Sequence, residues 1–284
     1  MPFRALRASG GDPLWVDQEG DAFARDDAPL MEWTEADKPF ARLWVDGPTS
    51  AMWLQGVGWF GIDPRVPRIS IPATSGGAPR EARVWGMPTA LCFLERGELA
   101  LHAAAVDVGG AAVILGAPGQ YGKTTLASAF VRAGARLLSE DLTCCRSTAA
   151  TPALLPGPAL LRLRRDVFDR LGVPGGEVVA EEPGRVYVLG DEATRGTSDP
   201  VPLRAVVLLR KTAGAIELHP VPPARAIADL WSLAFKLPND DARSTCFAAV
   251  TDLAGRVPVW DLHRMLSYEQ LPAVVDAIVD TCLR

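Results

Sequence analysis

The stretch that organises this chain is residues 113–126, VILGAPGQYGKTTL. It begins with an apolar run typical of a buried strand, continues into a short loop with two glycines and a proline, and ends in Lys-Thr-Thr at the start of an amphipathic segment. A tight loop before a helix presents unpaired backbone N–H groups and the positive end of the helix dipole. The stretch therefore predicts a strand–loop–helix unit that binds phosphate.

The residues of this loop predict a nucleotide site. Ala117 stands where the first glycine of such loops is usual, a common replacement. We expect Lys123 to place its cation on the terminal phosphates of ATP and the Thr124 hydroxyl to bind Mg²⁺. Tyr121 is unusual here, and it either covers the phosphates or packs outward. The expected nucleotide-binding residues are Ala117, Pro118, Gly119, Gln120, Tyr121, Gly122, Lys123, Thr124 and Thr125.

Two acids follow the loop at short range. Glu140 and Asp141 end the strand-like run that comes after one short helix, and that run can return beside the first strand. Ligands bind at the carboxyl ends of strands in α/β sheets, so both acids are candidates for the site. Because successive strand residues point in opposite directions, both can serve only if the strand ends there and the chain turns. The alternative is an acidic strand end that faces water.

The acid pair indicates kinase chemistry. One carboxylate would hold magnesium and the other would accept a proton from an incoming hydroxyl, in a reaction that depends mainly on positioning and charge neutralisation. His102 precedes the loop on the first strand of a predicted hairpin that turns at Asp107-Val108-Gly109-Gly110. That hairpin could bring His102 near the phosphates, although a lone histidine is more often structural.

The order of His102, the 117–124 loop and the acids at 140–141 resembles HPr kinase/phosphorylase and the related phosphoenolpyruvate-carboxykinase-like P-loop proteins. The likeness covers roughly residues 100–145 and implies a mixed-sheet kinase fold. It implies that Asp141 binds magnesium, that Glu140 accepts the proton and that His102 lies near the transferring phosphate, with Lys123 on the nucleotide. The Glu-Asp order departs from the family's usual Asp-Asp, so the two roles could be exchanged.

Within that superfamily the chain looks most like the small kinases of lasso peptide biosynthesis, which phosphorylate a serine hydroxyl at the C-terminus of a precursor peptide. The phosphorylase signature of the bifunctional enzymes is not found in the C-terminal part, so phosphorolysis is not carried over. The resemblance therefore predicts an ATP-dependent kinase of a peptide or protein serine. A small-molecule kinase on the same fold and a nucleotide-switched binding module remain the alternatives.

The distribution of residue types along the chain predicts an α/β fold with two regions. Residues 1–95 carry six of the eight tryptophans among short apolar runs broken by Gly and Pro, which predicts a β-rich region. This region either folds alone or adds strands to the kinase sheet, and we favour the second alternative because no clear linker precedes residue 98. Residues 96–284 form the expected P-loop kinase core, with a strong strand at 203–211 and amphipathic helices at about 223–236 and 269–283. The segment 177–202 is polar and turn-rich.

Basic residues suggest an acceptor site. The densest cluster is Arg162, Arg164 and Arg165, which could bind a peptide carboxylate or the triphosphate if it faces the phosphate site. Otherwise these side chains form the solvated start of a helix.

Bulk composition limits the partners. The net charge of −5 and the lack of a Lys/Arg-rich tract argue against nucleic acid as a partner. The N-terminus has no apolar core of a secretory signal and no segment approaches a membrane span, so we expect a cytoplasmic protein. The five cysteines show neither metal nor disulfide spacing, and we expect reduced, buried thiols. The oligomeric state stays open.

Overall fold

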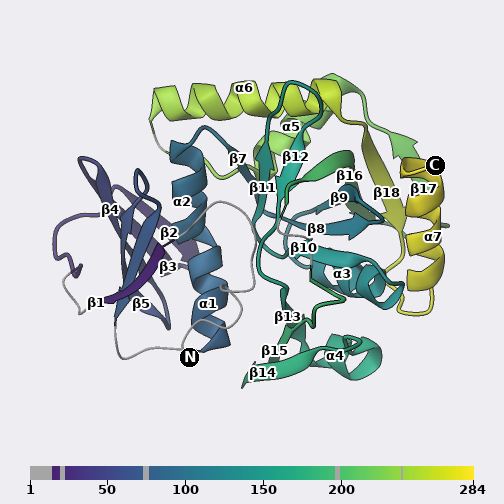
Figure 1. Cartoon of the computed structure of the whole chain (residues 1–284), viewed down its shortest axis with the longest axis horizontal. Helices are drawn as coiled ribbons and strands as arrows, with labels where there is room; N and C mark the ends of the chain where they lie inside the picture. The colour runs from purple at the N-terminus through teal and green to yellow at the C-terminus, as the bar shows by residue number, and fades with distance from the viewer. Residues whose placement is uncertain (1–14, 20–22, 73–76, 196–198, 238) are drawn as a thin grey trace.

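The computed structural model describes residues 15–19, 23–72, 77–195, 199–237 and 239–284. These residues form a mixed α/β protein with a six-stranded, a nine-stranded and a three-stranded sheet. Figure 1 shows the six-stranded sheet at one end of the molecule, separated from the nine-stranded sheet by two helices.

The N-terminal sheet is largely antiparallel, in the order β1-β6-β5-β4-β3-β2. Its strands are β1 (Trp15–Glu19), β2 (Met31–Glu35), β3 (Lys38–Asp46), β4 (Thr49–Leu54), β5 (Gly58–Asp63) and β6 (Arg68–Pro72). Apolar side chains alternate along β3 to β6, and those on one face pack against Val84, Leu91 and Cys92 of the following helices. Those helices are α1 (Ala78–Trp85) and α2 (Met87–Glu95).

Two expectations about residues 1–95 therefore change. The region is β-rich only as far as β6, because two helices follow. Its strands also form a sheet of their own, so the expectation that they extend the central sheet is wrong.

The central sheet contains the start of the 113–126 stretch, because residues 111–116 form one of its strands. Its main path is β10-β8-β9-β16-β12-β11-β7, with β18 beside β16 and β17 beside β18. The predicted hairpin is present as β8 and β9, and β10 lies beside β8, one strand removed from β9. Strands β9, β16 and β18 run parallel, so their carboxyl ends meet at one edge. The strands are β7 (Leu99–Leu101), β8 (Ala103–Val108), β9 (Ala111–Gly116), β10 (Arg136–Ser139), β11 (Thr143–Arg146), β12 (Ala153–Leu155), β16 (Val201–Lys211), β17 (Glu217–Pro220) and β18 (Val259–Arg264).

Helices cover both faces of the central sheet. α3 (Lys123–Arg132) and α7 (Leu271–Cys282) pack on one face, while α5 (Pro223–Leu233) and α6 (Asp240–Arg256) pack on the other. Adjacent strand residues divide between these faces: Val113 and Leu115 contact the α3 side and Ile114 the α5 side. The predicted helices at 223–236 and 269–283 are thus present, whereas α6 was not foreseen.

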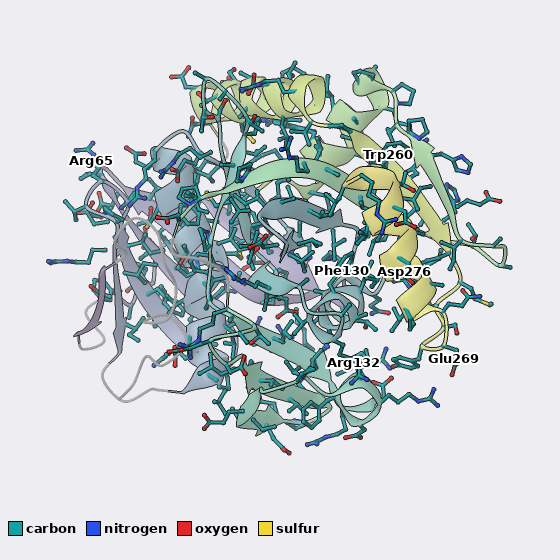
Figure 2. The ribbon with its side chains drawn as sticks, turned by 45° about the vertical axis from the view of Figure 1, so that its right-hand side comes forward. Arg65, Phe130, Arg132, Trp260, Glu269 and Asp276 are labelled. Carbon is teal, nitrogen blue, oxygen red and sulfur yellow. The ribbon has the colours of Figure 1, made fainter. Side chains whose placement is uncertain are left out.

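Side chains in Figure 2 follow the same division. Phe130, on α3, is directed into the core, where only 1% of it is exposed. Arg132 at the end of the same helix and Asp276 on α7 lie at the surface. The face of α3 that meets the sheet is therefore apolar, as its spacing predicted.

The three-stranded sheet lies below the central sheet in Figure 1, beside α4 (Arg165–Leu171). Its strands are β13 (Leu160–Arg164), β14 (Glu177–Glu182) and β15 (Arg185–Leu189). The segment 177–202, expected to be mainly turns, therefore contains two strands and the start of β16.

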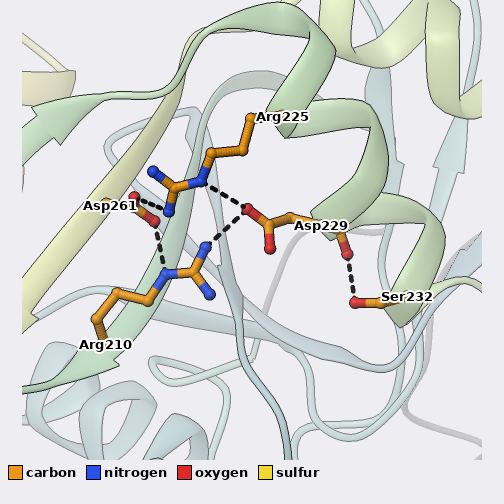
Figure 3. Close-up of polar contacts among 5 residues, drawn as sticks. All are labelled: Arg210, Arg225, Asp229, Ser232 and Asp261. Atoms are coloured by element: carbon orange, nitrogen blue, oxygen red, sulfur yellow. Dashed lines mark hydrogen bonds and ion pairs between the residues drawn. The ribbon is translucent and has the colours of Figure 1, made fainter.

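An ion network holds α5 against the central sheet. Asp261 on β18 accepts hydrogen bonds from Arg210 of β16 and from Arg225 of α5 (Figure 3). Asp229 of α5 accepts a second bond from Arg210 at 2.7 Å. The buried Asp261 carboxylate is thus neutralised by two cations from different elements.

The five cysteines are free thiols, four of them buried. Within the described ranges, no helix has the length and apolar composition to cross a membrane.

Candidate functional site

The loop at residues 117–122 connects β9 to the first turn of α3. Gly116 ends β9 and Lys123 begins the helix. The backbone is left-handed at Gln120, with φ 64°, and at Gly122, with φ 81°. These two turns fold the loop over the helix N-terminus, where the first backbone N–H groups have no partner within the helix. The loop has the conformational features that an anion site at a helix N-terminus requires.

Lys123 lies over this loop. Its ammonium donates to the carbonyl of Ala117 at 2.8 Å and lies 3.1 Å from His102 Nε2. Burial lowers the pKa of Lys123, while the nearby Glu140 and Asp141 carboxylates act in the opposite sense. The ammonium is held by neutral loop carbonyls, and an anion bound in the loop would be a better partner for it.

His102 is brought to the loop by the hairpin, as its position in the sequence suggested. Ala103 pairs with Gly116, so the residue before Ala103 lies beside the start of the loop. The His102 backbone N–H also donates to Leu233 at the end of α5, at 2.7 Å. Burial, followed by repulsion from Lys123, lowers the pKa of His102, so the imidazole is neutral near pH 7.

The two acids lie on a sharp turn directly after β10. Asp141 has a φ of 63°, and Leu142 N–H donates to the carbonyl of Glu140 at 2.7 Å, which closes a three-residue γ-turn. This turn directs both carboxylates into one pocket. Ser139 and Thr143 brace it, since their hydroxyls meet at 2.8 Å and Thr143 donates to the carbonyl of Ala103. The strand therefore ends and the chain turns, which was the condition for both acids to serve.

The acids differ in environment. Glu140 is buried, and its carboxylate oxygens accept hydrogen bonds from the Thr124 hydroxyl at 2.6 Å and from the backbone N–H of Arg162 at 2.9 Å. Burial, together with the charge of Asp141, raises the pKa of Glu140 to about 8. The Asp141 side chain is 48% exposed and lies 4.0 Å from the Arg162 guanidinium. One acid is thus held against the helix start, and the other opens to the pocket.

The donor set at Glu140 fits a magnesium ion. A hydroxyl and a carboxylate are hard oxygen ligands, and Mg²⁺ is commonly held by one or two protein oxygens with phosphates and waters. Burial and the Asp141 charge raise the pKa of Glu140 and so disfavour its ionised form, which a bound divalent cation would favour. Among the described residues, no group of three or more His, Cys, Asp or Glu side chains could hold a metal ion. Phosphates and waters would therefore have to complete the coordination of the magnesium ion.

One pocket of about 550 Å³ collects most of these groups. It contains His102, Lys123, Glu140 and Asp141 together with five of the other eight expected loop residues: Gly119, Gln120, Gly122, Thr124 and Thr125. Ala117 and Pro118 contribute carbonyls to Lys123 from behind the loop.

Tyr121 turns away from the pocket. Its ring packs half-buried against the α3–α7 core, with the Lys211 ammonium 4.4 Å from the ring centre. Of the two alternatives for this residue, the structure excludes a cover over the pocket.

The arginine cluster is divided by the fold. Arg162 and Arg164, on β13, line the pocket, whereas Arg165 does not and pairs instead with Glu181 and Asp169. Sequence reasoning missed several pocket residues that come from distant elements, among them Val167, Arg185, Arg264, Tyr268 and Leu271. For Arg264 a signal existed, because the alternating run at 259–264 ends in an arginine at the carboxyl end of a strand.

Comparisons with known proteins do not identify a function, so any functional assignment rests on the residues of the pocket. No family model matches the chain, and no curated protein matches it. Among solved structures, the Hpr(Ser) kinase/phosphatase from Coxiella burnetii is similar, with a TM-score of 0.34 and 10% sequence identity over 64% of this chain and 93% of that chain. A TM-score this low carries no argument about function.

Proposed function

We propose that this chain is an ATP-dependent kinase that transfers the γ-phosphoryl group to a serine hydroxyl of a peptide or protein. The observation that carries the proposal is the acid turn. It places one carboxylate on the Thr124 hydroxyl at the helix start and leaves a second one open to the same pocket, beside Lys123. A phosphate site with two carboxylates at such short range suits phosphoryl transfer to a hydroxyl.

The start of α3 and the loop before it would bind the phosphates. The backbone N–H groups of the 117–122 loop would hold the phosphates of ATP, and Lys123 would exchange the Ala117 carbonyl for a phosphate oxygen. Thr124 and Glu140 would hold Mg²⁺, which when bound neutralises phosphate charge. This assignment exchanges the acid roles that the resemblance implied, because Glu140 rather than Asp141 contacts Thr124.

Asp141 is then the proton acceptor. Its carboxylate faces the pocket, where it can accept the proton as the serine oxygen attacks the γ-phosphorus and ADP leaves with the bridging oxygen. His102, neutral and 3.1 Å from the Lys123 ammonium, keeps that cation in place without adding a competing charge.

The acceptor side of the pocket supports a peptide. Arg162 and Arg164 lie there with apolar Leu163, Val167 and Leu271, a combination that fits a chain end with a carboxylate and an apolar neighbour. The finer proposal is therefore the C-terminal serine of a ribosomal precursor peptide of the lasso type. This part also rests on the sequence resemblance.

The test incubates the protein with Mg-ATP and peptides that end in serine, peptides with internal serine, and free serine, each read by mass spectrometry. We expect a phosphoryl adduct on the terminal-serine peptides. Asp141→Asn should lower kcat by about 10²- to 10⁴-fold, the usual contribution of a general base. Glu140→Gln should instead raise the Mg²⁺ concentration needed for half-maximal rate.

Asp169→Asn is the matched control, since Asp169 is an exposed acid on α4 outside the pocket. Phosphotransfer at the wild-type rate by Asp141→Asn would show that Asp141 is not the base. An adduct on free serine alone would identify a small-molecule kinase. Nucleotide binding without any phosphorylated product would favour a nucleotide-switched binding module.

A further inference from the structure

Arg264 is a buried arginine at the edge of the pocket. It is the last residue of β18, on the same face of the strand as Leu262, so it points toward α3 and its preceding loop. Its exposed fraction is 2%, and its Nη2 donates to the Tyr121 carbonyl at 3.4 Å. Its Nε is buried and has no hydrogen-bond partner.

The charge of Arg264 is not balanced. No carboxylate of the described residues forms an ion pair with it, and burial alone lowers its pKa. The guanidinium also lies at the positive end of the α3 dipole, beside the loop over which Lys123 lies. A buried cation in such surroundings is costly unless an anion joins it.

Arg210, on the neighbouring strand β16, shows the contrast. It pairs with both Asp229 and Asp261 at 2.7 Å, and these partners raise its pKa. The partly exposed Arg210 is therefore compensated on one face of the sheet, whereas the more deeply buried Arg264 is uncompensated on the other. The uncompensated one faces the pocket.

Position along the loop identifies the part of the ligand that Arg264 would meet. A Cβ added at Gly122 would lie 2.9 Å from Arg264 Nη2, so the guanidinium is packed against Tyr121 and Gly122. Loop N–H groups at these positions hold the α- and β-phosphates in phosphate loops, whereas the lysine reaches the β- and γ-phosphates. The Lys123 ammonium lies at the start of the loop, on the Ala117 carbonyl and beside His102.

We infer that Arg264 is a phosphate-binding residue for the diphosphate portion of the nucleotide, the portion that ATP and ADP share. This inference rests on the proposed function. The guanidinium meets a non-bridging oxygen through Nε and Nη2, so the ligand supplies the partner that the protein does not.

Two measurements test it, and neither depends on catalysis. Titration calorimetry compares Mg-ADP, Mg-ATP and inorganic pyrophosphate with the wild type and with Arg264→Met and Arg264→Lys. Arg264→Met should weaken all three ligands by about 10- to 100-fold, the worth of one or two charge-assisted hydrogen bonds. Arg264→Lys should recover only part of this, because an ammonium lacks the planar fork.

Thermal unfolding separates ligand binding from a structural role. Without ligand, Arg264→Met should keep or raise the wild-type Tm, because it removes an unbalanced buried charge. With Mg-ADP, the Tm increase seen for the wild type should shrink. Arg243→Gln is the control: Arg243 is an exposed arginine on α6, on the other face of the central sheet from the loop, and its removal should change affinity by about 2-fold or less.

The outcomes are distinct. Equal affinities of the wild type and Arg264→Met, or a lower Tm of ligand-free Arg264→Met, would overturn the inference while leaving the proposed kinase intact. If the wild type binds Mg-ADP and Mg-ATP through Arg264 but phosphorylates no acceptor, the inference stands and the proposed function fails. No binding of any of the three ligands would overturn both.

Discussion

Two strained residues of the described part of the chain lie where the chemistry is proposed. Gln120 and Asp141 are two of four non-glycine residues with positive φ among the described residues, and both line the pocket. A side chain in the left-handed region costs about 1–2 kcal/mol, so such residues persist only where the surroundings impose them. At Asp141 the strain allows two consecutive carboxylates to reach one site, which an extended strand would forbid.

Two glycines of the loop lead to a prediction about stability at the scale of single residues. Gly122→Ala should lower the free energy of unfolding by about 1–2 kcal/mol, because Gly122 is left-handed and the new Cβ would meet Arg264. Gly119→Ala is the matched control, with no atom within 4 Å of its added Cβ and no positive φ. Urea unfolding of both variants measures the difference. Equal stability of the pair would show that the loop relaxes around the methyl group.

Among elements, α5 depends on electrostatics as well as apolar packing. Asp261→Asn should lower the free energy of unfolding by about 2 kcal/mol, because Arg210 and Arg225 lose a charged acceptor while Asp229 stays partly exposed. Asp276→Asn, on the exposed side of α7, should change it by less than about 0.5 kcal/mol. An Asp261→Asn variant as stable as Asp276→Asn would mean that the apolar contacts of α5 suffice.

Sequence patterns revealed the elements whose signals are local. The β8–β9 hairpin, α3 and the acids after β10 lie within about forty residues, and their turn residues and helical spacing are visible in the chain. The sequence did not predict which strands share a sheet, because paired strands such as β16 and β9 lie far apart along the chain. Arg264 carried only a strand-end signal, and its place beside the loop depends on a fold that returns β18 to that loop. α6 was missed because its apolar residues form no clear stripe.

At the scale of the molecule, Trp85 joins the N-terminal region to the acid turn by a hydrogen bond. Trp85, the last residue of α1, donates its indole N–H to the carbonyl of Leu142 at 3.1 Å, directly after Asp141. Its ring also occupies the space above Gly157, where an added Cβ would lie 2.3 Å from it. The N-terminal sheet is separate from the central sheet, yet its helices hold the turn that carries both acids.

Trp85→Phe tests whether that contact positions the acids. The change keeps most of the apolar contact and removes one buried hydrogen bond worth about 1 kcal/mol, so we expect kcat to fall by roughly 5-fold with the KM for ATP unchanged. Trp53→Phe is the control, because Trp53 lies on β4 of the N-terminal sheet, where its ring contacts Arg42. Steady-state kinetics with the acceptor peptide decides the matter. If both variants lower kcat equally, the effect is one of general stability, and the contact at Leu142 does not orient Asp141. A fall confined to Trp85→Phe would mean that the two regions act as one catalytic unit, with α1 setting the geometry of a turn that belongs to the central sheet.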